Sequence, residues 1–148
     1  MEGLGRIDDG PLPWTIAIVV SNASMYKFEQ LEVYQLALEY VDLVYTLAEK
    51  LPRSEDYNLK SQITRAATSI ALNIAEGSTG QSDAEQGRFL AMAIRSLLET
   101  VACRHIIQRR GYLDQHDTLI KQLDTAGQKL ARKLQAMRKA VYEVDDGR

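Results

Sequence analysis

Apolar residues with helical spacing recur in four successive segments between Phe28 and Val141, and this pattern restricts the fold more than any other feature. Spacing at i, i+3, i+4 and i+7 places the apolar side chains on one face of a helix. All three prolines lie at or before Pro52, so no later helix is interrupted by one. No alternating strand pattern follows Pro52. The chain after Pro52 is therefore predicted to be helical.

The expected buried face of each helix can be read from these apolar positions. The four sets are Tyr34, Ala37, Leu38, Val41, Val44, Tyr45 and Ala48; Leu59, Ile63, Ala66, Ala67, Ile70 and Ile74; Leu90, Ala93, Ile94, Leu97 and Val101; and Leu119, Leu123, Ala126, Leu130, Leu134, Met137 and Val141. Short connections between long helices favour antiparallel neighbours. We predict an all-α, antiparallel, up-down-up-down four-helix bundle over residues 25–142, with a frayed tail at 143–148.

Local signals mark the ends of these helices. Pro52 ends the first, because a proline disfavours helical geometry in the residue before it. Gly77 is expected to end the second as a left-handed C-terminal cap. Ser82 and Glu85 form a capping box that begins the third, and Gly111 ends it.

Residues 1–24 differ in composition from the rest and are predicted to form an irregular N-terminal extension. β-Branched residues concentrate at Thr15–Val20, which favours an extended conformation there. Two interpretations stay open: a functional arm, or an upstream translated stretch before a start at Met25. Because its pattern belongs to none of the helices, we predict that the extension is dispensable for folding and assembly.

Size and cysteine usage suggest a cytoplasmic protein. The chain of 148 residues is long enough to bury a core without disulfides or metals, and it has one cysteine. No apolar run reaches the length of a membrane helix, and the start of the chain lacks the basic residues of a secretory signal. We expect no membrane association.

The first helix carries a second apolar stripe, formed by Leu36, Tyr40, Leu43 and Leu47. The second helix carries an outward stripe formed by Arg65, Ser69, Leu72 and Glu76. A core that wraps more widely than usual is one explanation. We favour contact with another subunit, since monomers rarely leave large apolar patches open.

No catalytic, cofactor or metal site is predicted. Cys103 and His105 are two residues apart on a helix, so their side chains diverge and cannot form a nucleophile–base pair. The other histidine, His116, is in no metal-binding motif.

Basic residues concentrate in the second half of the chain, although the formal charge is only −2. The candidate contacts to nucleic acid are Arg104, Arg109, Arg110, Lys121, Arg132 and Lys139. A solvated face that complements the helix dipoles explains the same pattern, and both interpretations stay open.

The segment from Arg65 to Gly77, RAATSIALNIAEG, is similar to the signature of a bacterial four-helix-bundle family, the 23S rRNA intervening-sequence proteins. Phe28-x-x-Leu31-x-Val33-Tyr34-x-x-Ala37 and Glu85-x-x-x-Phe89-Leu90-x-x-Ala93 resemble it too. The resemblance covers about residues 26–140 and implies a helical bundle, closed rings (of five subunits in some relatives) and no established enzymatic activity. More remotely, the bundle looks like the accessory variability protein of diversity-generating retroelements, which contacts nucleic acid.

Within the signature, Asn73 lies at the edge of the buried face, where its amide must find partners. We expect it to bond to backbone or to another helix and to have a structural role, like Gly77. The predicted function is that of a non-enzymatic, homo-oligomeric scaffold or adaptor for a protein partner. The alternative is sequence-independent binding of RNA or DNA.

Overall fold

The computed structural model describes residues 26–80 and 82–146. Four helices form the bundle: α2 (Glu32–Glu49), α3 (Leu59–Ser78), α4 (Asp83–Arg109) and α5 (Thr118–Asp146). Two short 3-10 helices, η2 (Lys27–Gln30) and η3 (Arg53–Glu55), precede α2 and α3. No strand occurs in this part of the chain. The predicted extension, including Thr15–Val20, lies outside the described residues.

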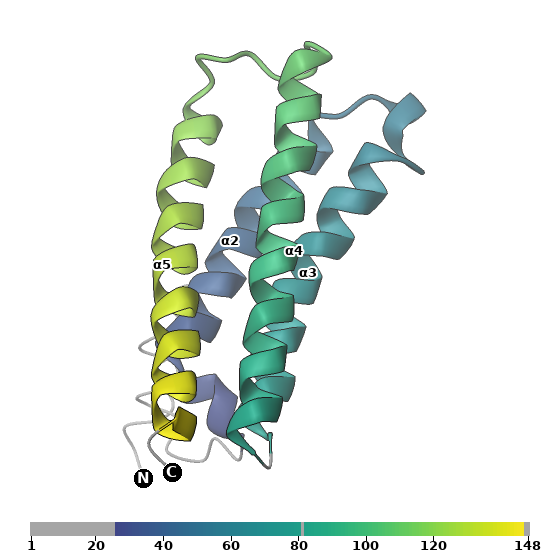
Figure 1. The fold of residues 1–148 in the computed structure, drawn as a ribbon. Coiled ribbons are helices and arrows are strands. Elements are labelled where there is room, and N and C mark those ends of the chain that lie inside the picture. Colours follow the sequence, from purple (N-terminus) through teal and green to yellow (C-terminus); the bar gives the residue numbers. More distant parts are fainter. Residues whose placement is uncertain (1–25, 81, 147–148) are drawn as a thin grey trace, which may run out of the picture.

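Successive helices run in opposite directions and pack around a common core (Figure 1). Each helix contacts the next along the chain, and α5 closes the bundle against α2. The antiparallel four-helix bundle is therefore confirmed. The end of the bundle was predicted at residue 142, whereas α5 continues to Asp146.

Side chains and glycine conformation define the helix ends. Ser82 Oγ accepts a hydrogen bond from the Glu85 backbone N–H at 3.1 Å, which confirms the predicted cap of α4. At the other end of α4, Gly111 has φ +77°, and Tyr112 N–H donates to the carbonyl of Ile107. This left-handed glycine closes the helix as a Schellman motif.

Gly77 is not a helix cap, so that prediction was wrong. It lies inside α3, and Gly111 is the only described glycine with positive φ. The hydroxyls of Ser78 and Thr79 donate to the carbonyls of Ala75 and Glu76 at the C-terminal end of the helix. A Cβ at Gly77 would lie 2.9 Å from Phe89 Cβ, so glycine is required there because α3 and α4 approach closely.

Tyr40 and Leu47 are buried inside the subunit, at 2% and 0% exposure, which corrects their prediction as part of an exposed stripe. The reason is the position of α2, which packs against both α3 and α5 and therefore needs two apolar flanks. Tyr45, expected in the core, is instead 48% exposed. The buried face of α2 is rotated toward α5 relative to the prediction.

Candidate functional site

The outer surface between α2 and α3 is hollowed and partly apolar. Leu72 of α3 is 56% exposed and Tyr45 of α2 is 48% exposed. Both line a groove of about 400 Å³ that also contains Arg65 and Glu76. All four predicted interface residues of α3 line this groove, namely Arg65, Ser69, Leu72 and Glu76.

A small polar network joins the lining of this groove to α4. Asn73 is 7% exposed, and its Nδ2 donates to the Ser69 carbonyl at 2.8 Å and to Ser69 Oγ at 2.9 Å. Ser96 Oγ of α4 donates to Ser69 Oγ at 2.9 Å. The predicted bond from Asn73 to backbone is thus confirmed within its own helix. Ser69, which lines the groove as predicted, also links α3 to α4.

A second groove, of about 550 Å³, lies on the opposite flank of α2, against α5. Leu36, Leu43 and Ala126 form its apolar lining, with Glu39 on the α2 side. Lys121 and Lys129 line the α5 side. Because Leu43 and Tyr45 are two residues apart on a helix, their side chains diverge by roughly 200°. The predicted interface is therefore divided between two separate surfaces.

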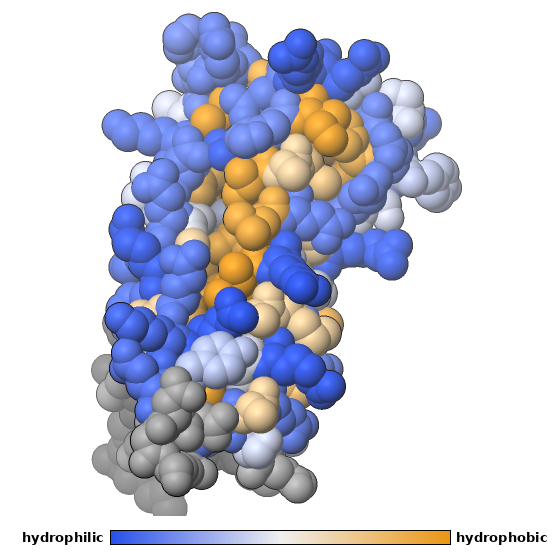
Figure 2. All heavy atoms as spheres, in the orientation of Figure 1, coloured by the Kyte–Doolittle hydropathy of each residue, from blue (hydrophilic) through white to orange (hydrophobic). Residues whose placement is uncertain are grey.

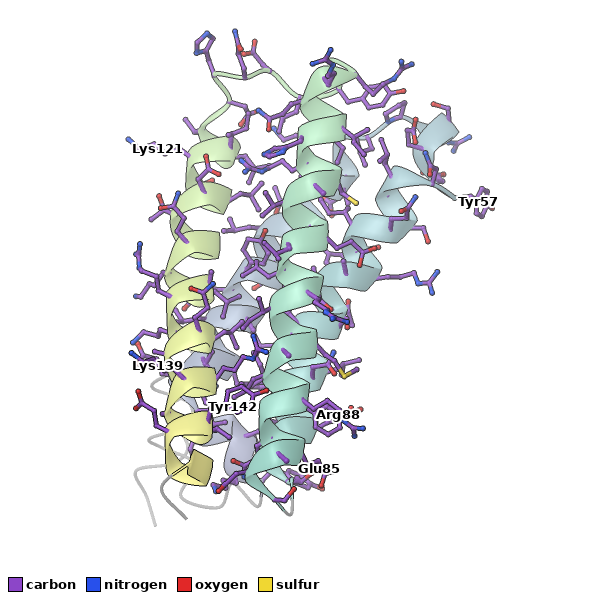
Figure 3. All side chains as sticks on the ribbon, in the orientation of Figure 1. Tyr57, Glu85, Arg88, Lys121, Lys139 and Tyr142 are labelled. Atoms are coloured by element: carbon purple, nitrogen blue, oxygen red, sulfur yellow. The ribbon has the colours of Figure 1, made fainter. Side chains whose placement is uncertain are left out.

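The outer face of α5 is basic. Lys121, Arg132 and Lys139 are all exposed, as the sequence predicts. Lys121 and Lys139 point away from the bundle on the same side (Figure 3). Lys139 lies 3.8 Å from Glu143 one turn away, with both side chains mostly in solvent. Such exposed pairs contribute little energy, so they leave the lysine free to meet another anion.

Arg104 does not belong to this face, which corrects another prediction. Its side chain is buried, and its Nη2 lies 2.6 Å from Asp124 Oδ1 of α5. A buried cation needs an anionic partner, and Asp124 provides one within the subunit. Arg109 and Arg110 are exposed at the C-terminal end of α4, which is the end of the bundle nearer to Lys121.

Sequence reasoning missed an apolar ridge on α4. Leu98 and Ile106 are 62% and 49% exposed, with the exposed Ala102 midway between them. Figure 2 shows apolar side chains gathered along α4 and its boundary with α5. The ridge could have been predicted from the sequence, because these three apolar residues follow one another at i, i+4 and i+8 outside the stripe assigned to the core.

Titratable residues do not gather into a reactive cluster in the part of the chain that the structure describes. There, no group of three or more His, Cys, Asp and Glu residues could hold a metal ion. Cys103 is buried, and burial raises the pKa of its thiol, so the thiol is protonated at neutral pH. His105 and His116 are both exposed. None of the described helices is long and apolar enough to cross a membrane.

These observations define an all-α four-helix bundle whose distinctive features are surface grooves and a basic helix face. The model of the 23S rRNA-intervening sequence protein family matches residues 29–136, which is more than half of the chain. The protein therefore belongs to this family, as the resemblance of residues 65–77 indicates. No curated protein matches the sequence.

Proposed function

We propose that the protein is a self-assembling scaffold whose subunits meet through the surface between α2 and α3. The observation that carries the proposal is the adjacent exposure of Leu72 and Tyr45 over a groove. Covering large apolar side chains with a second subunit removes them from water, at roughly 25 cal/mol per Å² buried. Arg65 and Glu76 beside them supply one charge of each sign to orient the contact.

A closed ring needs two different surfaces on each subunit, because head-to-tail contacts are heterologous. The apolar ridge of α4, with Leu98 and Ile106, supplies a second exposed surface. We propose that this ridge meets the α2–α3 surface of the next subunit. The ring of five subunits implied by the family resemblance is the expected closure.

Sedimentation velocity of the full chain tests this assembly. Leu72→Asp and Leu98→Asp are each expected to give helical monomers, because each places a carboxylate in an apolar contact. Tyr57→Asp is the matched control, since Tyr57 is 99% exposed in the turn before α3, projects from the bundle (Figure 3) and does not line the α2–α3 groove. A monomeric wild-type protein, or an oligomer that survives both leucine substitutions, contradicts the proposal.

A second candidate function is binding of nucleic acid by the outer face of α5. It is supported by the alignment of Lys121, Arg132 and Lys139, which span about 27 Å of helix at 1.5 Å per residue. Phosphate contacts of this kind are insensitive to sequence and weaken steeply with salt. In a ring, they would be repeated and would reinforce one another.

Titration of labelled RNA and DNA at about 50 mM salt, where such contacts are strongest, tests this function. Reversal of Lys121, Arg132 and Lys139 to Glu should abolish binding while helix content and oligomer mass stay unchanged. If the wild-type protein has no affinity under these conditions, the basic face is a solvated surface, and the scaffold binds a protein partner instead. A cytoplasmic location fits either function.

A further inference from the structure

The groove between α2 and α5 is the larger of the two grooves that flank α2, and neither proposed function uses its apolar lining. Leu36, Leu43 and Ala126 line it, with Glu39 on the α2 side and both Lys121 and Lys129 on the α5 side. The lining residues Thr118 to Lys129 extend over about 16 Å of α5. An occupant should therefore be an extended segment with aliphatic side chains and negative charge.

The chain itself contains such a segment. Residues 14–20 read Trp-Thr-Ile-Ala-Ile-Val-Val, and they lie outside the described part of the structure. In an extended segment, alternate side chains point to the same side. The large apolar residues Trp14, Ile16, Ile18 and Val20 would then share one side. Two acidic residues, Asp8 and Asp9, precede this segment.

We propose that residues 14–20 bind in the α2–α5 groove of their own chain, with Asp8 and Asp9 directed toward Lys121. The apolar side of the segment would cover Leu36 and Leu43, and the acidic pair would complement the lysines of the groove. The α2–α3 groove is a poorer match, because Arg65, Thr64, Thr68, Asn73 and Glu76 make its lining more polar than that of the α2–α5 groove.

The length of the chain permits this placement. The chain enters α2 through η2, which packs against α2 and α3. The carbonyl of Glu29 accepts a hydrogen bond from Gln35 Nε2, so the chain enters at the end of α2 that carries Leu36. The six peptide steps from Tyr26 back to Val20 can span about 20 Å. Seven extended residues cover about 23 Å, enough for the whole groove.

The segment stays dispensable for forming the four helices, but it gains a specific role as the cover of an apolar surface. This docking also assigns Leu36 and Leu43 to a contact within the chain, separate from the proposed contact between subunits at Leu72.

Trp14 makes the test direct, since it is the only tryptophan in the protein. In the full chain, we expect blue-shifted Trp14 emission and weak quenching by acrylamide. Leu43→Asp should shift the emission to the red and raise the quenching constant severalfold. Ile18→Asp, which lies outside the four helices, should do the same, and circular dichroism should show unchanged helix content.

Leu72→Asp is the matched control, because it places the same charge in the other groove. It should leave Trp14 emission unchanged while it disrupts assembly, and Leu43→Asp should have the reverse effects. The two proposals can therefore fail separately.

Exposed Trp14 in the wild-type chain, or exposure caused by Leu72→Asp alone, overturns docking in this groove. Emission that shifts to the red on dilution overturns docking within the same chain, because it assigns the groove to the segment of a second copy.

Discussion

Tyr40 Oη lies 2.7 Å from Thr100 Oγ1, and this buried hydrogen bond joins α2 to α4 across the middle of the bundle. A Cβ at Gly127 of α5 would lie 3.2 Å from the Tyr40 ring, so the glycine leaves space for it. Burial raises the pKa of the Tyr40 hydroxyl, which therefore stays protonated at neutral pH. The bond connects two helices that are not neighbours in the chain.

Tyr40→Phe should lower the free energy of unfolding by about 0.5–1.5 kcal/mol, the usual net value of a hydrogen bond. The loss should be modest because Thr100 Oγ1 also lies 2.6 Å from the Leu97 carbonyl and is not left alone. Urea denaturation of the single and double variants with Thr100→Val measures the coupling. Strictly additive effects would show that this bond contributes nothing to stability.

Asp124→Asn should destabilise the fold by about 1–3 kcal/mol, because it removes the carboxylate that balances buried Arg104. The exposed pair Lys139–Glu143 provides the comparison, and Glu143→Gln should cost less than about 0.5 kcal/mol. Denaturant melts of both variants check this difference. Equal losses would mean that the environment of Arg104 is as solvated as that of Lys139.

Gly77→Ala should be destabilising by about 1–3 kcal/mol, as expected for overpacking against Phe89. At an open helical position, the same change would stabilise by about 1 kcal/mol through helix propensity. Phe89→Gly removes the Cβ that a side chain at Gly77 would meet, so it should abolish most of the cost of Gly77→Ala in the double variant. Thermal melts of the four proteins test this, and a stabilised single variant would contradict the close approach of α3 and α4.

Stability should fall in acid as the carboxylate of Asp117 becomes protonated. This carboxylate accepts the Leu119 backbone N–H at the start of α5 and pairs with Lys50 at 3.0 Å, and these contacts lower its pKa. A pKa that is lower in the folded state gives stability that is present above the unfolded value, about 3.9, and is lost as pH falls through the folded value. Asp117→Asn should therefore flatten the decline between pH 5 and 3 in thermal melts. An unchanged slope would assign the decline to other carboxylates, such as Glu55, whose pKa is also lowered, chiefly by the hydrogen bond from Asn58.

The sequence by itself determined the fold class, because helical spacing, capping residues and the absence of later prolines are local properties. Ser82, Gly111 and the apolar stripe of α5 could all be interpreted within one or two helical turns. The basic face of Lys121, Arg132 and Lys139 was predictable for the same reason, since it lies opposite a single clean stripe.

Tertiary structure decided which side of each helix meets a neighbour. Tyr40 and Leu47 are buried because α2 lies between α3 and α5, and the sequence of α2 alone does not say how many neighbours it has. Arg104 became a buried partner of Asp124 because residues 20 positions apart in the chain meet across α4 and α5. Gly77 is needed to fit against Phe89, and the division of Leu43 and Leu72 between two grooves depends on helix rotation. Periodicity specifies a face, but the burial of that face depends on contacts with residues distant in the chain.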